Sequence, residues 1–155
     1  PAFSQKWNLV ELYCGSGNLT FPLAQRVGQV TAIEESRSAL HEAEQRALKE
    51  KIHNVEFISG SAEWGLKKVT RREKPVDILV IDPPRRGAKE ILDLIMVLKP
   101  RQVVYVSCDP PTLARDLKFL VQRHYQLEVV QPLDMFPQTY HIESVALLER
   151  GSAAG

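Results

Sequence analysis

Five apolar segments rich in β-branched residues recur along the chain, with amphipathic stretches between them. They are "NLVELYC" (8–14), "QVTAIE" (29–34), "VEFISG" (55–60), "VDILVID" (76–82) and "QVVYVSC" (102–108). Short apolar runs of this kind are typical of strands buried on both faces. The stretches between and after them have helical periodicity, over 18–27, 36–51, 61–73, 88–99 and 110–124. This alternation predicts an α/β fold, a parallel sheet with helices on both faces.

Two more strand-like runs, 127–136 and 143–150, end the pattern with only "PQTYHI" between them. That connection is too short for a parallel crossover, so the two strands should pair antiparallel. We therefore expect a mostly parallel seven-stranded sheet with an antiparallel last strand. The domain should span 1–150, and "GSAAG" (151–155) should be a flexible tail.

Composition excludes several classes of protein. The 155 residues are 44% hydrophobic and 25% charged, which is ordinary for one globular domain. No apolar run approaches the roughly 18 residues of a membrane span. Cys14 and Cys108 are too few for a disulfide framework or a Cys-only zinc site, so we expect no metal and a reducing, cytoplasmic location. The net charge of +1 limits any nucleic-acid contact to a local surface.

Glycines and acids gather where the predicted strands end, which is where parallel sheets bind ligands. Gly15 and Gly17 follow the first strand, and glycine lets the backbone approach a ligand closely. Glu34 ends the second strand, where a carboxylate can accept both ribose hydroxyls of an adenosine. Thr20 replaces the third glycine of the dinucleotide fingerprint. The pattern leaves NAD and S-adenosylmethionine open, and a tight turn beside a solvated acid is the structural alternative.

Four segments, considered together, carry a more specific signal. They are "LYCGSGN", "IDPPRRG", "YVSCDPPTLARDL" and "DMFPQTYHIESVALL", and they extend from residue 12 to residue 148. In this order they resemble the S-adenosylmethionine-dependent RNA uracil-C5 methyltransferase family, whose catalytic domain has a Rossmann-like class I methyltransferase fold. The resemblance implies methyl transfer from S-adenosylmethionine to C5 of uridine in rRNA or tRNA.

The resemblance also assigns roles to single residues. The cysteine of the family's "SC-(N/D)-P" motif is the nucleophile and corresponds to Cys108, and the glutamate of its "HxE" motif is the base and corresponds to Glu143. The expected cofactor-binding residues are Tyr13, Gly15, Gly17, Asn18, Glu34, Ser61 and Asp82. Two positions depart from the family pattern, because Glu11 replaces the usual Asp and Ser61 replaces a frequent Asp or Asn. Family members carry RNA-binding domains upstream, so we expect this chain to be the C-terminal catalytic domain without them, with RNA as its partner.

The chemistry of uracil explains why the family needs a thiol and a carboxylate. A thiolate added to C6 makes C5 nucleophilic, which is covalent catalysis, and a general base then removes the proton from C5. Cys108 precedes a predicted helix whose dipole favours a thiolate, although a core cysteine at a strand end is the structural alternative. Two other functions stay open. One is methylation of another base or of an amino group, although Arg85 follows the two prolines where amino-group methyltransferases usually have an aromatic residue. The other is a catalytically silent module that binds a nucleotide or RNA.

Three further features have two interpretations each. Arg115 could contact a phosphate or form an ion pair with a neighbouring acid. The basic run "KKVTRREK" (67–74) could be a solvated helix face or an RNA contact. Cys14, in the glycine loop, is interpreted as a small packing residue rather than a reactive thiol.

Overall fold

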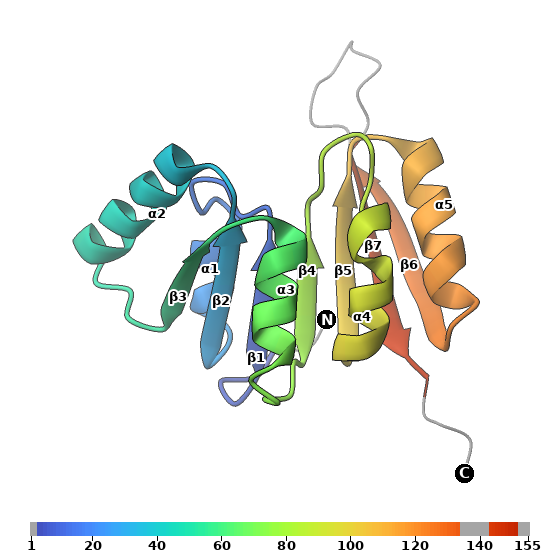
Figure 1. Ribbon diagram of the computed structural model, residues 1–155, viewed down its shortest axis with the longest axis horizontal. Helices are drawn as coiled ribbons and strands as arrows, with labels where there is room; N and C mark the ends of the chain where they lie inside the picture. Colours follow the sequence, from blue (N-terminus) through green and yellow to red (C-terminus); the bar gives the residue numbers. More distant parts are fainter. Residues whose placement is uncertain (1–2, 134–142, 152–155) are drawn as a thin grey trace.

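The computed structural model describes residues 3–133 and 143–151 and contains seven strands and five α-helices in that part of the chain (Figure 1). The strands are β1 (Asn8–Leu12), β2 (Gln29–Glu34), β3 (Val55–Ser59), β4 (Ile78–Ile81), β5 (Gln102–Ser107), β6 (Tyr125–Leu133) and β7 (Glu143–Arg150). The helices are α1 (Thr20–Ala24), α2 (Arg37–Lys49), α3 (Ala62–Thr70), α4 (Leu92–Leu98) and α5 (Pro110–Val121), with a 3-10 turn η1 (Lys89–Ile91) before α4.

The strands form one sheet in the order β3-β2-β1-β4-β5-β7-β6. The first five in sequence are parallel, and β7 lies antiparallel between β5 and β6. The predicted fold class, including the single antiparallel last strand, is therefore confirmed. The strand order reverses direction between β1 and β4, and this switch point is where open α/β sheets bind ligands.

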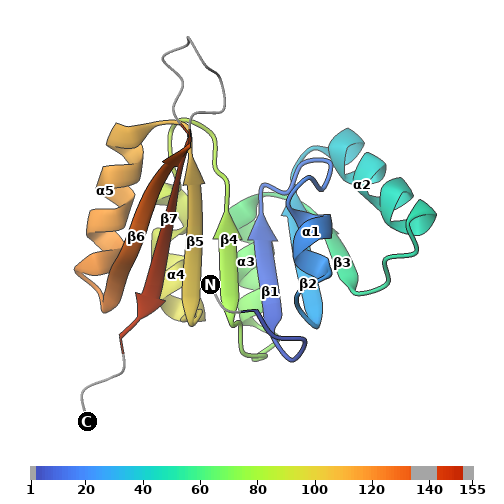
Figure 2. The same ribbon diagram turned by 180° about the vertical axis from the view of Figure 1, so that it is seen from behind.

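Helices cover both faces of the sheet, as predicted. α3, α4 and α5 lie on one face, and α1 and α2 lie on the other (Figures 1 and 2). On the first face, Leu66, Ile95 and Leu120 from the three helices belong to one fully buried cluster with strand residues. On the second face, Ala24 and Leu40 pack with strand residues in another cluster. Burial of β1, β2 and β4 on both sides explains their continuous apolar sequences.

The second face has no helix over β5, β7 and β6 in the described part of the chain (Figure 2). β6 is correspondingly exposed after its first residue, Tyr125. Val129 pairs with Leu147 in the register of the two strands and is 47% exposed. No described helix has the length and apolar character needed to cross a membrane.

Local structure departs from the sequence prediction at two elements. The first helix was predicted over 18–27, but α1 covers only Thr20–Ala24, because the preceding loop is built from turns with positive φ angles at Gly15 (54°) and Gly17 (91°). β6 begins at Tyr125 rather than at 127. Residues 134–142, which include much of the fourth motif, and 152–155, nearly all of the predicted tail, lie outside the described residues, so the domain limits stay predictions.

Candidate active site

The loop between β1 and α1 is tied to the end of β2 through Glu34. The Gly15 N–H donates to Glu34 Oε2 at 2.9 Å, and the Ser36 N–H donates to Oε1 at 2.8 Å. Gly17 has a φ of 91°, and a Cβ there would lie 2.5 Å from the Phe21 ring, so only glycine fits. Each Glu34 oxygen keeps a second lone pair, which leaves the carboxylate able to accept ribose hydroxyls.

A pocket of about 210 Å³ opens beside this loop, at the carboxyl ends of β1 and β2. Among the residues predicted to bind cofactor, Tyr13 and Glu34 line it. Ser61 lies between two residues that line it and caps α3, because its hydroxyl accepts the Trp64 N–H at 3.3 Å. Asn18 is exposed on the glycine loop and does not line this pocket.

Sequence reasoning missed several residues that line the same pocket, namely Ile33, Glu35, Gly60, Ala62, Pro84 and Arg86. All but Arg86 lie within two residues of a predicted position, so extending each predicted position by two residues would have found them. Arg86 is held by an ion pair with Glu90, at 3.1 Å from Nη2 to Oε1. The same Glu90 oxygen accepts the Tyr13 hydroxyl at 3.4 Å.

Two carboxyl groups near the strand ends have raised pKa values. Glu11 is 2% exposed, and burial raises its pKa to about 7, with a smaller contribution from the negative charge of Asp82. The Thr20 hydroxyl, 2.6 Å from Glu11 Oε2, opposes that rise by donating a hydrogen bond. Asp82 is exposed, yet its pKa is raised to about 6. Partial desolvation is the larger cause, and the negative charge of Glu143 is the smaller one.

Cys108 and Glu143 occupy neighbouring positions at this edge of the sheet. Ser107, the last residue of β5, pairs with Ser144 of β7. Cys108 follows Ser107 and Glu143 precedes Ser144, so these two residues occupy adjacent positions on the paired strands. Cys108 is partly buried and lies just before α5, whose N-terminus is capped by Asp109, which accepts the Thr112 N–H at 3.1 Å. Cys108 and Glu143 therefore lie at the ends of two paired strands, and Asp82 follows β4, the next strand in the sheet.

A buried carboxylate connects the loop after Asp82 with the helix after Cys108. Asp116 is 0% exposed, and its Oδ2 accepts the Ala88 N–H and the Tyr105 hydroxyl, each at 2.7 Å. Arg115 Nε donates to Asp116 Oδ1 at 2.8 Å, and Arg115 Nη2 donates to the Arg86 carbonyl at 3.0 Å. Of the two interpretations of Arg115, the structure contains the ion pair.

Asp116 was also missed from the sequence, although a signal was present. It lies among Leu113, Leu117 and Leu120, the buried apolar residues of α5. A charged residue on the apolar face of a helix is almost never buried without partners. That position alone could have marked Asp116 as part of a structural network.

A model of the tRNA (uracil-5-)-methyltransferase family matches residues 2–151. The chain belongs to this family. An uncharacterized RNA methyltransferase of Caldanaerobacter subterraneus is 41% identical over 143 residues, which are 92% of this chain and 32% of the relative. The 23S rRNA (uracil(1939)-C(5))-methyltransferase RlmD of Photobacterium profundum is 39% identical over 94% of this chain and 31% of its own. The chain thus spans about a third of the length of these curated relatives.

Solved structures agree with this membership. The tRNA (uracil-54, C5)-methyltransferase of Pyrococcus abyssi, in complex with S-adenosyl-L-homocysteine, superposes with a TM-score of 0.77 at 31% identity, over 95% of this chain and 35% of that one. An rRNA methylase of Streptococcus thermophilus has a TM-score of 0.77 at 18% identity, over 97% of this chain and 90% of that one, and shows the shared fold alone. The fold is therefore that of class I methyltransferases.

The glycine loop also contains a second thiol, Cys14. It is 6% exposed, and burial, followed by the charges of Glu11 and Glu34, raises its pKa to about 12. A buried, protonated thiol is a poor nucleophile. The interpretation of Cys14 as a packing residue is supported by its place in the core cluster on the α1 and α2 face.

Proposed function

We propose that this domain transfers a methyl group from S-adenosylmethionine to C5 of a uridine in RNA, with Cys108 as nucleophile and Glu143 as general base. The observation that carries the proposal is the meeting of Cys108 and Glu143 at the ends of β5 and β7. A thiol and a carboxylate are the two groups that this chemistry needs. Both relatives with assigned targets are named as uracil-C5 methyltransferases of RNA, one for 23S rRNA and one for tRNA.

The described residues fit the cofactor. Glu34 faces the glycine loop at the end of β2 with free lone pairs, which is where an adenosine ribose is bound in sheets of this kind. Tyr13 and the Gly60–Ala62 turn provide the adjoining walls of the pocket. Ser61 is a weaker candidate contact, because its hydroxyl already caps α3. When bound, S-adenosylmethionine supplies an electrophilic methyl group.

The residues of this chain have separate duties in the reaction. The Cys108 thiolate forms a bond to C6 of uracil, which pushes electron density to C5 so that C5 can form its bond to the methyl carbon. Glu143 then takes the proton from C5, and the Cys108–C6 bond breaks as the C5–C6 double bond returns. Asp82, beside Glu143 at the end of β4, lies where it can hydrogen-bond the base.

The test is a covalent trap with a short single-stranded RNA that contains 5-fluorouridine, in the presence of radiolabelled S-adenosylmethionine. Fluorine at C5 cannot be removed as a proton, so the proposal predicts a denaturation-resistant protein–RNA adduct that carries the label. Cys108→Ala should abolish the adduct, and Cys14→Ala should keep it, because the Cys14 thiol is buried and protonated. Cofactor binding without any adduct in the wild type would leave a silent binding module instead.

A further inference from the structure

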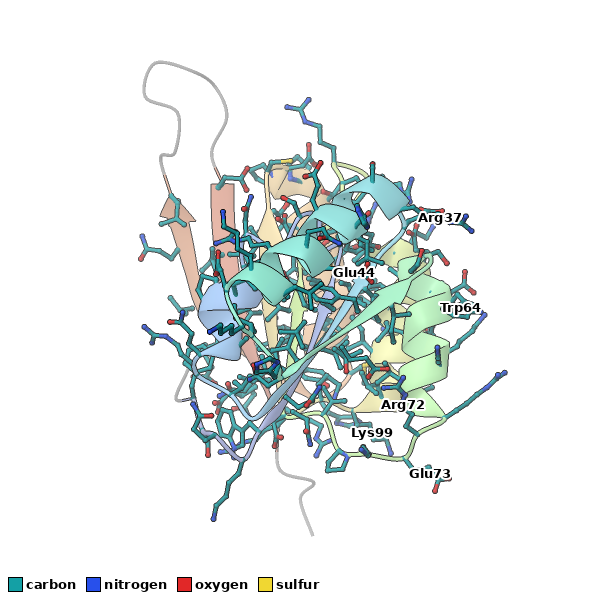
Figure 3. All side chains as sticks on the ribbon, turned by 90° about the vertical axis from the view of Figure 1, so that its left-hand side faces the viewer. Arg37, Glu44, Trp64, Arg72, Glu73 and Lys99 are labelled. Atoms are coloured by element: carbon teal, nitrogen blue, oxygen red, sulfur yellow. The ribbon has the colours of Figure 1, made fainter. Side chains whose placement is uncertain are left out.

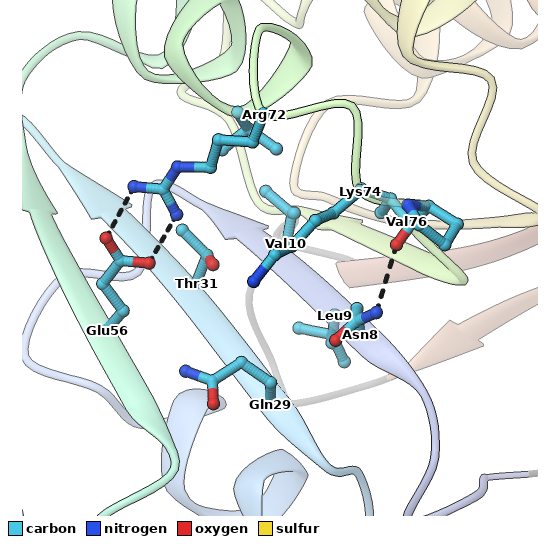
Figure 4. Close-up of a pocket in the computed structure, with 11 residues that line it drawn as sticks. Asn8, Leu9, Val10, Gln29, Thr31, Glu56, Arg72, Lys74 and Val76 are labelled. Atoms are coloured by element: carbon cyan, nitrogen blue, oxygen red, sulfur yellow. Dashed lines mark hydrogen bonds and ion pairs between the residues drawn. The ribbon is translucent and has the colours of Figure 1, made fainter.

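A second pocket, larger than the one beside Glu34, lies at the opposite edge of the sheet (Figure 4). Its volume is about 350 Å³, against about 210 Å³ for the first pocket. Its walls come from the first residues of β1, β2 and β3 and from the loop between α3 and β4. Strands of five or six residues separate the two edges by roughly 20 Å. The proposed reaction at Cys108 therefore has no use for this pocket.

Thr31 of β2 presents a polar group to the second pocket. Its side chain lines the pocket, although the residue is only 8% exposed. Its hydroxyl has no hydrogen-bond partner in the described part of the chain, yet it is not among the described side-chain atoms that are both buried and unpaired, so solvent in the pocket reaches it. The hydroxyl is therefore free to hydrogen-bond a ligand that enters the pocket.

The charged residues that line the second pocket are two cations, Arg72 and Lys74, and one carboxylate, Glu56, so its rim has a net positive charge. Arg72 is fixed by two parallel hydrogen bonds to Glu56, at 2.5 and 2.6 Å, and these two charges cancel (Figure 4). Lys74 forms no ion pair with a described carboxylate, and its ammonium group points over the pocket toward β1 and β2 (Figure 4). The pocket therefore suits a ligand with an anionic group at its mouth.

The interior of the second pocket suits a heterocyclic base. Val10, Val69 and Val76 provide apolar walls, on which a flat ring can lie. The Gln29 amide and the Thr31 hydroxyl offer both donors and acceptors, which match the alternating edge of a nucleobase. Pockets that bind small molecules combine an apolar lining with a few placed polar groups in this way.

A basic surface on α3 connects the two pockets. Trp64, at the start of the helix beside the first pocket, is 50% exposed, and the Lys68 ammonium lies 5.2 Å from the centre of its ring. Trp64 lies at the outer edge of the molecule in Figure 3, whereas Arg72 follows α3 and pairs with Glu56 of β3. An exposed aromatic ring next to basic side chains is how proteins bind single-stranded nucleic acid, by stacking bases and pairing phosphates.

We propose that the second pocket binds one unstacked nucleotide of the RNA substrate, with its base against the valines and its phosphate at Lys74. The RNA strand follows the outer side of α3 from the first pocket to the second. This assignment makes the basic run 67–74 an RNA contact rather than only a solvated helix face. It rests on the proposed function in one respect, which is that RNA is the substrate.

The test uses the protein saturated with S-adenosyl-L-homocysteine, so that the first pocket is filled, and a short single-stranded RNA as the probe. Methyl NMR signals of Val10, Val69 and Val76 should shift on titration. Thr31→Val should weaken RNA binding about 3- to 10-fold, the effect of one hydrogen bond, and Lys74→Gln should weaken it by a similar factor. Lys49→Gln, a matched change of an exposed lysine on α2, should leave the affinity unchanged.

The stability of Thr31→Val separates a binding role from a structural one. Because the hydroxyl has no partner, valine should keep or raise the melting temperature while it lowers RNA affinity. RNA binding that is equal in all four proteins, or signal shifts confined to the first pocket, would overturn the proposal. Shifts with uridine 5′-monophosphate but not with RNA would also overturn it, in favour of a free nucleotide. Failure of the 5-fluorouridine trap with these shifts intact would remove the proposed reaction alone.

Discussion

Replacing Glu11 by glutamine should stabilise the domain at neutral and alkaline pH. Glu11 lies inside β1 at 2% exposure, and its Oε2 accepts a hydrogen bond from the Thr20 hydroxyl at 2.6 Å. Glutamine has the same shape, and its carbonyl oxygen can accept the same hydrogen bond. It cannot ionise, however, and the substitution therefore removes only the cost of placing a negative charge in the core.

The size of the effect follows from the pKa. Burial raises the pKa of Glu11 from 4.5 to about 7, so the folded state holds the proton more tightly than the unfolded state. The stability from this group is fully present below pH 4.5 and is lost as the pH rises through 7. At about 1.4 kcal/mol per pH unit, the wild type loses about 3 kcal/mol between these limits. Glu11→Gln should escape this loss.

Urea denaturation from pH 5 to pH 8 measures the effect directly. The free energy of unfolding of Glu11→Gln minus that of the wild type should grow by about 2 kcal/mol over this range. The comparison of two proteins cancels the titration of groups that do not interact with Glu11. Glu42→Gln, an exposed change on α2, is the matched control and should give a difference that does not vary with pH.

A flat difference for Glu11→Gln would refute the reasoning. It would mean that Glu11 has nearly the same pKa in the folded and unfolded states, so that water or a rearrangement solvates its charge. A difference that falls as the pH rises would show the opposite sign, namely that the ionised form stabilises the fold. Either result would show that Glu11 is not a desolvated carboxyl group with a raised pKa.

Three other substitutions test the site. Glu34→Ala should weaken S-adenosylmethionine binding at least 10-fold in calorimetric titration, because the ribose loses two hydrogen bonds to a charged acceptor; unchanged affinity would remove Glu34 from the cofactor site. Glu143→Gln should accumulate a denaturation-resistant adduct on ordinary uridine RNA, because the C5 proton stays in place; normal turnover without adduct on gels would assign the base elsewhere. Asp116→Asn should lower the free energy of unfolding by about 2 kcal/mol in urea titrations, because Arg115 loses its charged partner and the amide can no longer accept from every donor; an unchanged midpoint would contradict the bridging role.

Much of the fold could be predicted because its signals are local. Each of these signals comes from residues that are adjacent in the sequence. They are the continuous apolar strands, the short connection before β7 and the Asp109-Pro110 pair that starts α5. The place of Glu143 beside Cys108 is different, because it depends on a pairing between strands 35 residues apart. The register of Ser107 with Ser144 provides that pairing.

What could not be predicted depends on which face a side chain occupies and what lies opposite. Thr31 in "QVTAIE" looks like any β-branched strand residue, and only the three-dimensional arrangement shows that its side chain lines a pocket and has no hydrogen-bond partner among residues 3–133 and 143–151. Asp116 looks like one polar residue of an amphipathic helix until Ala88 and Tyr105 are seen around it. The length of α1 depended on the φ angles of the glycine loop, which residue types alone do not fix.

The place of β7 in the sheet has a consequence for how the site is made. The strand lies between β5 and β6, although it follows both along the chain. During synthesis from the N-terminus, β5 and β6 therefore have no direct partner in each other, and the sheet stays divided until β7 is inserted. Cys108 is in place at the end of β5 before Glu143 arrives on β7. The last strand to join the sheet is thus also the one that completes the proposed catalytic pair.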